Sequence, residues 1–307
     1  MVMVESGAKA ADGSKEKAKT EDGGSNATKI GPLFFVALGL GAVGCYLAFL
    51  SPSAARIQKA VLEPDGVTPG ESTDNFIFVC ACVGLCGTFD MAIARLFGAG
   101  RYFALHTAIN MVCVAFTWRD AILALSFANP FDSNSCVLPG TPCANKLSMD
   151  LTMGIHLWHS LAYALKPIDW IHHLPAHAVC AIGIFLAWGP VLNLSIIVLM
   201  GIPGGIDYAL LTATKLGLLH PSVEKNLNQS LNVWLRCPVT TLSAYLMFFG
   251  ALLHPEHFAG TGHRVGHALI GVHHFWNGNF FMYRTVDART RYVLKEKEKK
   301  AQAAGGK

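Results

Sequence analysis

Long apolar stretches separated by short polar connections run through most of the chain, from about residue 30 to residue 283. A helix needs about 20 predominantly apolar residues to cross a bilayer. Lipid offers no hydrogen-bond partners, so such stretches must satisfy their backbone groups internally. The pattern predicts an all-α fold, a polytopic transmembrane bundle of about seven or eight spanning helices. The candidate spans are residues 31–51, 75–97, 102–127, 149–165, 174–190, 191–214, 232–253 and 266–283.

Four of these candidates differ from a plain lipid-facing span. Residues 149–165, 174–190 and 266–283 are short or polar, so we expect them to be buried among neighbouring helices. In the span 191–214, Pro190 and the run Gly201–Gly205 predict a kink or a broken helix, because proline lacks a backbone donor.

Composition strengthens the membrane assignment. Of the 307 residues, 52% are hydrophobic and only 14% are charged. A soluble globular protein carries about 25% charged residues. The composition excludes a soluble enzyme, a disordered chain and a nucleic-acid binder with a basic patch. We therefore expect membrane lipids as partners and no nucleic acid, while a homo-oligomer or a larger membrane complex stays open.

The charged residues divide the chain into three parts. Residues 1–29 are small, polar and free of aromatic side chains, which predicts a disordered N-terminal tail. Residues 30–283 form the expected membrane domain, and residues 284–307 a basic C-terminal tail. Basic segments stay on the cytosolic side of a membrane, so this tail should be cytosolic. With eight spans, the N-terminus is expected to be cytosolic as well.

Two cysteines lie in the connection formed by residues 128–148. Cys136 and Cys143 share this segment with a single basic residue, Lys146, so the segment should face the lumen or the exterior. Disulfides persist on that oxidising side of a membrane. The two cysteines could pair there, and two free thiols are the alternative.

Histidines are unusually frequent, with 13 in the chain. His156 and His159 lie three residues apart and share a helix face, and the pair His172 and His173 lies at the start of the next candidate span. Neutral imidazole serves both as a metal ligand and as a general base. The segment 263–267 has the H-x-x-x-H form of a histidine-box oxygenase, but no H-x-x-H-H element occurs. We therefore assign no metal ligand, and a metal-dependent lipid hydroxylase is the third functional alternative.

Ionisable residues inside the spans are candidates for function, because an unpaired charge in a membrane is costly. Asp90 lies in the middle of its span, so it should face the bundle interior. Asp207 follows the predicted helix break, and Arg236 lies in the span 232–253. A structural pair between helices is the alternative for each of them.

Residues 150–250 resemble the TLC domain family of membrane proteins. The motifs that carry the resemblance are I-H-H at 171–173, W-G-P-V-L-N at 188–193, an acid at Asp207, and N-V-W-L-R-C-P at 232–238. The resemblance implies a TLC-like core over about residues 75–255, a location in the endoplasmic reticulum or another endomembrane, and a role in lipid synthesis, trafficking or membrane composition.

The resemblance also implies roles for individual residues. In the ceramide synthase branch, a double histidine and a later His-Asp pair serve acyl transfer. Here the corresponding region reads M-G-I-P-G-G-I-D-Y and has no His-Asp pair, so enzymatic activity stays open. The expected catalytic residues are His172, His173 and Asp207, with acyl-CoA as the co-substrate. The expected lipid-binding residues are His156, His159, Asn193, Asn232, Arg236 and Asp90. A channel, a transporter or a structural subunit of a membrane complex is the second functional alternative.

Overall fold

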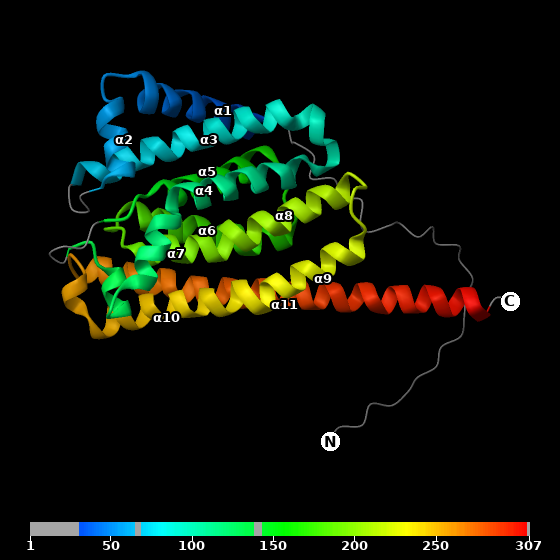
Figure 1. Cartoon of the computed structure of the whole chain (residues 1–307). Helices are drawn as coiled ribbons and strands as arrows, with labels where there is room; N and C mark the ends of the chain where they lie inside the picture. Colours follow the sequence, from blue (N-terminus) through cyan, green and yellow to red (C-terminus); the bar gives the residue numbers. More distant parts are fainter. Residues whose placement is uncertain (1–30, 65–68, 138–142, 306–307) are drawn as a thin grey trace, which may run out of the picture.

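The computed structural model describes residues 31–64, 69–137 and 143–305, and the expected N-terminal tail 1–29 lies outside the described residues. The described residues are helical, with no β-strand among them, and the long helices run side by side as a bundle (Figure 1). The fold class is therefore all-α, as predicted.

The N-terminal half of the bundle is formed by four α-helices together with short π-helical and 3₁₀-helical turns. A turn at Gly98, whose φ of +44° suits glycine, lets the chain reverse between the third and fourth helices. The elements are α1 (Pro32–Cys45), the π-helical turn η1 (Tyr46–Leu50), α2 (Ala54–Leu62), α3 (Pro69–Phe97), η2 (Gly98–Gly100), α4 (Arg101–Ser126) and η3 (Pro130–Asn134).

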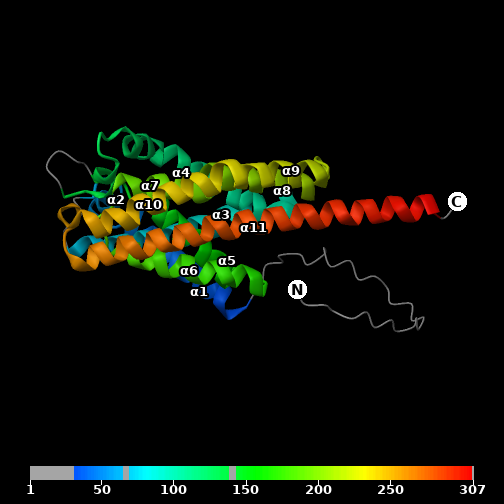
Figure 2. The same cartoon turned by 90° about the horizontal axis from the view of Figure 1, so that it is seen from below.

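The rest of the bundle holds the histidine-bearing helices and a long final helix. Its elements are α5 (Leu147–Ala162), α6 (Pro167–Ile184), α7 (Pro190–Ile196), η4 (Ile197–Gly201), α8 (Ile202–Lys215), α9 (Pro221–Leu231), η5 (Asn232–Arg236), α10 (Cys237–Leu253), η6 (Pro255–His257) and α11 (Thr261–Gly305). Proline begins α1, α3, α6, α7 and α9, since the first turn of a helix needs no donor from its N–H. Residues 284–305 of the expected basic tail continue α11, which extends beyond the neighbouring helices in both views (Figures 1 and 2).

Four helical stretches of the described residues are long and apolar enough to cross a membrane: Pro32–Leu50, Glu71–Ser126, Pro190–Lys215 and Pro221–Leu253. They fit an integral membrane protein, but the predicted seven or eight spans are not confirmed. The stretch Glu71–Ser126 folds back at η2, so α3 and α4 lie side by side (Figure 1). Helices α5, α6 and α11 are not among these four stretches, and α5 is only 16 residues long.

The predicted break near Gly201–Gly205 is wrong, because the chain stays helical from Pro190 to Lys215. A π-helical turn, η4, precedes Pro203. Such a turn shifts the hydrogen-bond register by one residue and so accommodates a proline that lacks an N–H. The same device recurs at η5, just before Pro238. Proline therefore alters the local winding of these helices without interrupting them.

Two helices occupy segments that were expected to be connections. Helix α2 has 9 residues, too few to cross a bilayer, whereas the 11 residues of α9 continue through η5 into α10 and extend that span towards the N-terminus. Helix α2 buries Ile57 and Val61 against the core. Helix α6 also begins at Pro167 rather than near residue 174, so the double histidine lies within its first two turns.

Helices α1 and α3 approach each other closely through glycine. Gly41 on α1 faces Gly84 on α3, and a Cβ atom on Gly41 would lie against the Cα atom of Gly84. Small residues allow helix backbones to come together in membranes, where dispersion contacts replace the hydrophobic effect as the driving force. This contact joins α1 to the remainder of the bundle.

We expect Gly41→Leu to lower the free energy of unfolding by about 1–3 kcal/mol, because the added side chain must separate two backbones. The matched control is Gly39→Leu on the same helix, where a Cβ atom meets nothing within 4 Å. Thermal unfolding of the two variants in detergent measures the difference. Equal melting temperatures would contradict the backbone contact.

Candidate functional site

A cavity lies inside the bundle, between α4, α5, α6, α8 and α11. About 860 Å³ of space in and at the mouth of the cavity is not filled by protein atoms, and part of this space is open to solvent. Apolar side chains form much of its wall, including Met149, Val179, Ile196, Leu199, Met200 and Ile270. Polar groups also reach it from several helices: His106, His156, His172, Asp207, Arg236 and His273. Apolar walls with a few converging polar groups are typical of a ligand site.

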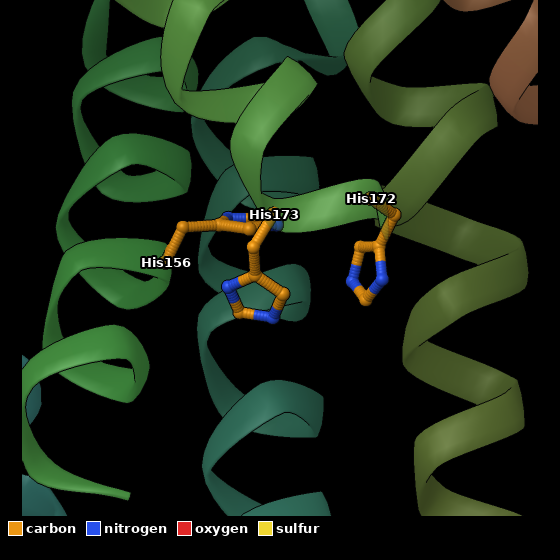
Figure 3. Close-up of side chains that lie close together, drawn as sticks. All are labelled: His156, His172 and His173. Atoms are coloured by element: carbon orange, nitrogen blue, oxygen red, sulfur yellow. The ribbon is translucent and has the colours of Figure 1, made fainter. Parts of the chain in front are cut away.

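Three histidines converge at one side of this cavity. The ring centroid of His173 lies 4.7 Å from that of His156 and 4.5 Å from that of His172. His156 comes from α5, and the other two come from the beginning of α6, as Figure 3 shows. His156 and His172 line the cavity and are half-buried, whereas His173 is fully buried behind them. Of the two predicted catalytic histidines, His172 is therefore the one that reaches the cavity.

One ring of this cluster has a defined tautomer. The His156 Nδ1 atom lies 2.7 Å from the backbone carbonyl of Thr152, which can only accept a hydrogen bond. Nδ1 must therefore carry the proton, and Nε2 keeps its lone pair. A neutral imidazole in this state can accept a proton or bind a metal ion through Nε2.

Aromatic and imidazole rings stack beside the cluster. His159 stacks on Tyr102 at a centroid distance of 4.3 Å, and His106 stacks on Tyr208 at 4.2 Å. The rings of His106 and His159 lie 4.4 Å apart and join the two stacks. His159, an expected lipid-binding residue, is not among the cavity-lining residues and lies in this ring stack.

Asp207 and Arg236 line the cavity from α8 and η5. Asn232 orients the arginine, because the Arg236 Nη1 atom donates a hydrogen bond of 2.7 Å to Asn232 Oδ1. The Arg236 guanidinium lies 5.0 Å from the ring centroid of Phe281. Asp207 Oδ1 and Arg236 Nε are buried and have no hydrogen-bond partner among the described residues. The two charged groups therefore have unused capacity to bind a polar ligand.

Asp90 lies inside the bundle, as expected, but the structure does not bring it to the cavity. Its carboxylate accepts hydrogen bonds of 2.6 and 2.5 Å from Arg101, 3.0 Å from Trp158 and 2.8 Å from Tyr163. The carboxylate is therefore fully engaged in joining α3, α4 and α5, which is the structural alternative to substrate binding.

Asn193, like Asp90, joins helices by hydrogen bonds and does not line the cavity. Its Nδ2 atom donates a hydrogen bond of 2.6 Å to Asp120, and its Oδ1 atom accepts one of 2.6 Å from Ser148 and one of 2.9 Å from Trp188. These bonds join α4, α5 and α7, and of the bonded residues only Trp188 lines the cavity. The asparagine and tryptophan of the W-G-P-V-L-N motif thus take part in hydrogen bonds that hold these helices together.

The cysteines of the connection before α5 are joined. Cys136 and Cys143 form a disulfide that closes a short loop, with a sequence separation of 7. Neither cysteine lines the cavity, so the disulfide takes no part in the candidate site.

Some of the cavity residues were not assigned from the sequence. His273, His274 and Phe281 of α11 line the cavity. His267, from the H-x-x-x-H segment, instead contacts Phe258 at a centroid distance of 5.0 Å. The spacing of 273 and 281, near two helical turns, is a signal that could have placed these residues on one face.

Comparisons of the chain with family models, with curated proteins and with solved structures find no match. The resemblance to the TLC domain family therefore stays a prediction, and the candidate site rests on its geometry.

We expect Arg101→Met to destabilise the protein by about 3–5 kcal/mol, because it leaves the Asp90 carboxylate buried and unpaired. The control is Arg95→Met, which removes an exposed arginine and should change stability by no more than about 0.5 kcal/mol. Denaturation in detergent, followed by tryptophan fluorescence, compares the two. A similar loss in both variants would contradict the structural role of the Asp90 pair.

Proposed function

We propose that this is a multi-pass membrane protein that handles lipids and holds an acyl chain in the cavity between α4, α5, α6, α8 and α11. The observation that carries the proposal is the cavity itself, with its apolar wall and its converging polar groups. The apolar side chains suit a hydrocarbon tail, and the imidazoles and the Asp207 and Arg236 groups suit a polar headgroup. The motif resemblance to TLC-domain proteins supports the same class of ligand.

If the protein is an acyltransferase, His172 is the general base. The imidazole would take the proton from a lipid amine or hydroxyl while that group attacks the thioester carbonyl of an acyl-CoA. The thioester bond then breaks, and the CoA thiolate leaves and takes up the proton. Positioned proton transfer of this kind contributes about 10²–10⁴-fold to a rate. Asp207 reaches the same cavity and can orient the polar substrate, while His173 holds the neighbouring rings in place.

The basic half of α11 supports an orientation. The C-terminal part of α11, whose sequence is rich in arginine and lysine, extends beyond the bundle (Figures 1 and 2), and basic segments are retained in the cytosol. We place the C-terminus there, and the N-terminus on the same side, in the endoplasmic reticulum or another endomembrane. A homo-oligomer or a larger membrane complex is compatible with this orientation.

A channel or transporter is the second candidate. It is favoured by the two π-helical turns, η4 and η5, next to the buried groups Asp207 and Arg236, since such turns often mark functional positions. Ion flux into liposomes, lost in Asp207→Asn, would support this candidate over lipid handling.

We expect Ala176→Phe to reduce the lipid that copurifies with the protein by about tenfold, equivalent to about 1.4 kcal/mol of binding free energy. Ala176 is buried and lines the cavity, so the added ring occupies the space of an acyl chain. The control is Ala178→Phe, two residues along α6, where the side chain is exposed. Mass spectrometry of lipids extracted from both purified variants makes the comparison. Equal lipid content in two well-folded variants would contradict the proposed occupant.

A further inference from the structure

The cluster of His156, His172 and His173 has the composition and the spacing of a metal site. One ring nitrogen from each side chain can be chosen so that the three lie within 4.8 Å of one another. The three side chains come from two neighbouring helices and lie close together (Figure 3). A four-coordinate zinc ion with Zn–N bonds of 2.0–2.1 Å places its nitrogen ligands about 3.3 Å apart. Small rotations of the three side chains would bring the ring nitrogens from within 4.8 Å of one another to this ligand spacing.

The hydrogen bonds around the cluster leave lone pairs on ring nitrogens available to bind a cation. The Thr152 carbonyl fixes the proton of His156 on Nδ1 and leaves Nε2 free. His173 Nδ1 lies 3.5 Å from Ser160 Oγ, and its Nε2 atom is buried with no hydrogen-bond partner among the described residues. Metal-bound histidines typically donate the other ring N–H to a carbonyl or a similar group, as His156 does. A buried ring nitrogen without a partner calls for an explanation, and a bound ion supplies one.

We propose that His156, His172 and His173 bind one divalent first-row transition-metal ion, with a fourth coordination position open to the cavity. Imidazole ligands suit zinc, iron, copper and nickel, and zinc is the first ion to test. Three protein ligands with an open position are the pattern of catalytic rather than structural zinc sites. The open position faces the cavity because His156 and His172 line it while His173 lies behind them.

A second group with ligand character, formed by His254, Glu256 and His257, is less suited to an ion. His254 Nδ1 already pairs with Glu256 at 3.1 Å. His257 Nδ1 lies 3.1 Å from the Phe131 carbonyl, and its Nε2 atom lies 3.3 Å from Asp132. Both ring nitrogens of His257 thus have protein partners, whereas His173 Nε2 in the first cluster has none among the described residues.

The metal site does not depend on the proposed lipid, but it excludes His172 as the general base, because a neutral imidazole has a single lone pair and the ion would occupy it. The sequence alone led to no metal ligand, because the histidines do not form the known box patterns. The structure instead combines one histidine of α5 with two adjacent histidines of α6, which no single sequence motif represents.

The test is the metal content of the full-length protein, purified in detergent through a tag that contains no histidine. We expect about one metal ion per chain by elemental mass spectrometry. After the ion is removed with a chelator, Zn²⁺ should raise the melting temperature, because a ligand that binds only the folded state stabilises it. Co²⁺ should give the visible absorption of a tetrahedral site.

The variants His156→Ala, His172→Ala and His173→Ala should each lower Zn²⁺ affinity by more than the 10–100-fold that loss of an outer-shell partner causes. Each should also lose the Zn²⁺-dependent rise in melting temperature while still showing a cooperative unfolding transition without metal. His257→Ala, in the second group, and His220→Ala, near the start of α9, are controls that should keep wild-type metal content.

Three results would overturn the proposal: a metal-free wild-type protein that Zn²⁺ does not stabilise, metal retained in all three cluster variants, or metal lost only in His257→Ala. Lipid measured on the same samples separates this proposal from the proposed function. Lipid without metal contradicts the metal site alone, and metal without lipid contradicts lipid handling alone.

Discussion

Polar side chains buried between apolar helices must find their partners inside the protein, because neither lipid nor a packed core supplies any. The Asp90 carboxylate meets this constraint with three donor residues on neighbouring helices. Asn193 meets it with equally short bonds to Asp120 and Ser148. These two networks join α3, α4, α5 and α7, and they fix the relative positions of the helices that surround the cavity.

The candidate site is one part of the bundle where this constraint is not met, and buried Asp150, outside the cavity lining, is another. His173 Nε2, Asp207 Oδ1 and Arg236 Nε are all buried and lack partners among the described residues. Asp207 and Arg236 line one cavity, and His173 lies directly behind two histidines that do. A stable fold tolerates such groups where a ligand or an ion completes them. Asp90 therefore contributes to the packing of the bundle, whereas Asp207 and Arg236 remain available to a ligand in the cavity.

The sequence predicted the fold class and the positions of most long helices, because apolar length is a strong local signal. It did not predict the helix through Gly201–Gly205, since proline and glycine mark a disturbed hydrogen-bond register without revealing that a π-helical turn repairs it. For the site, the histidines and Asp207 could be selected from their residue types alone. Their division into cavity groups and structural groups depends on contacts between helices distant in sequence, such as Trp158 with Asp90, which periodicity cannot show.

The histidine cluster nevertheless has a local origin. The four residues 163–166 connect α5 and α6, and so short a connection places two helices side by side and antiparallel. His156 lies near the end of α5 and His172 and His173 near the beginning of α6, so the hairpin alone brings the three rings together. The cavity, in contrast, needs α8 and α11 to close over that hairpin. Metal binding would thus draw on contacts within one helical hairpin, whereas lipid binding would require the assembled bundle.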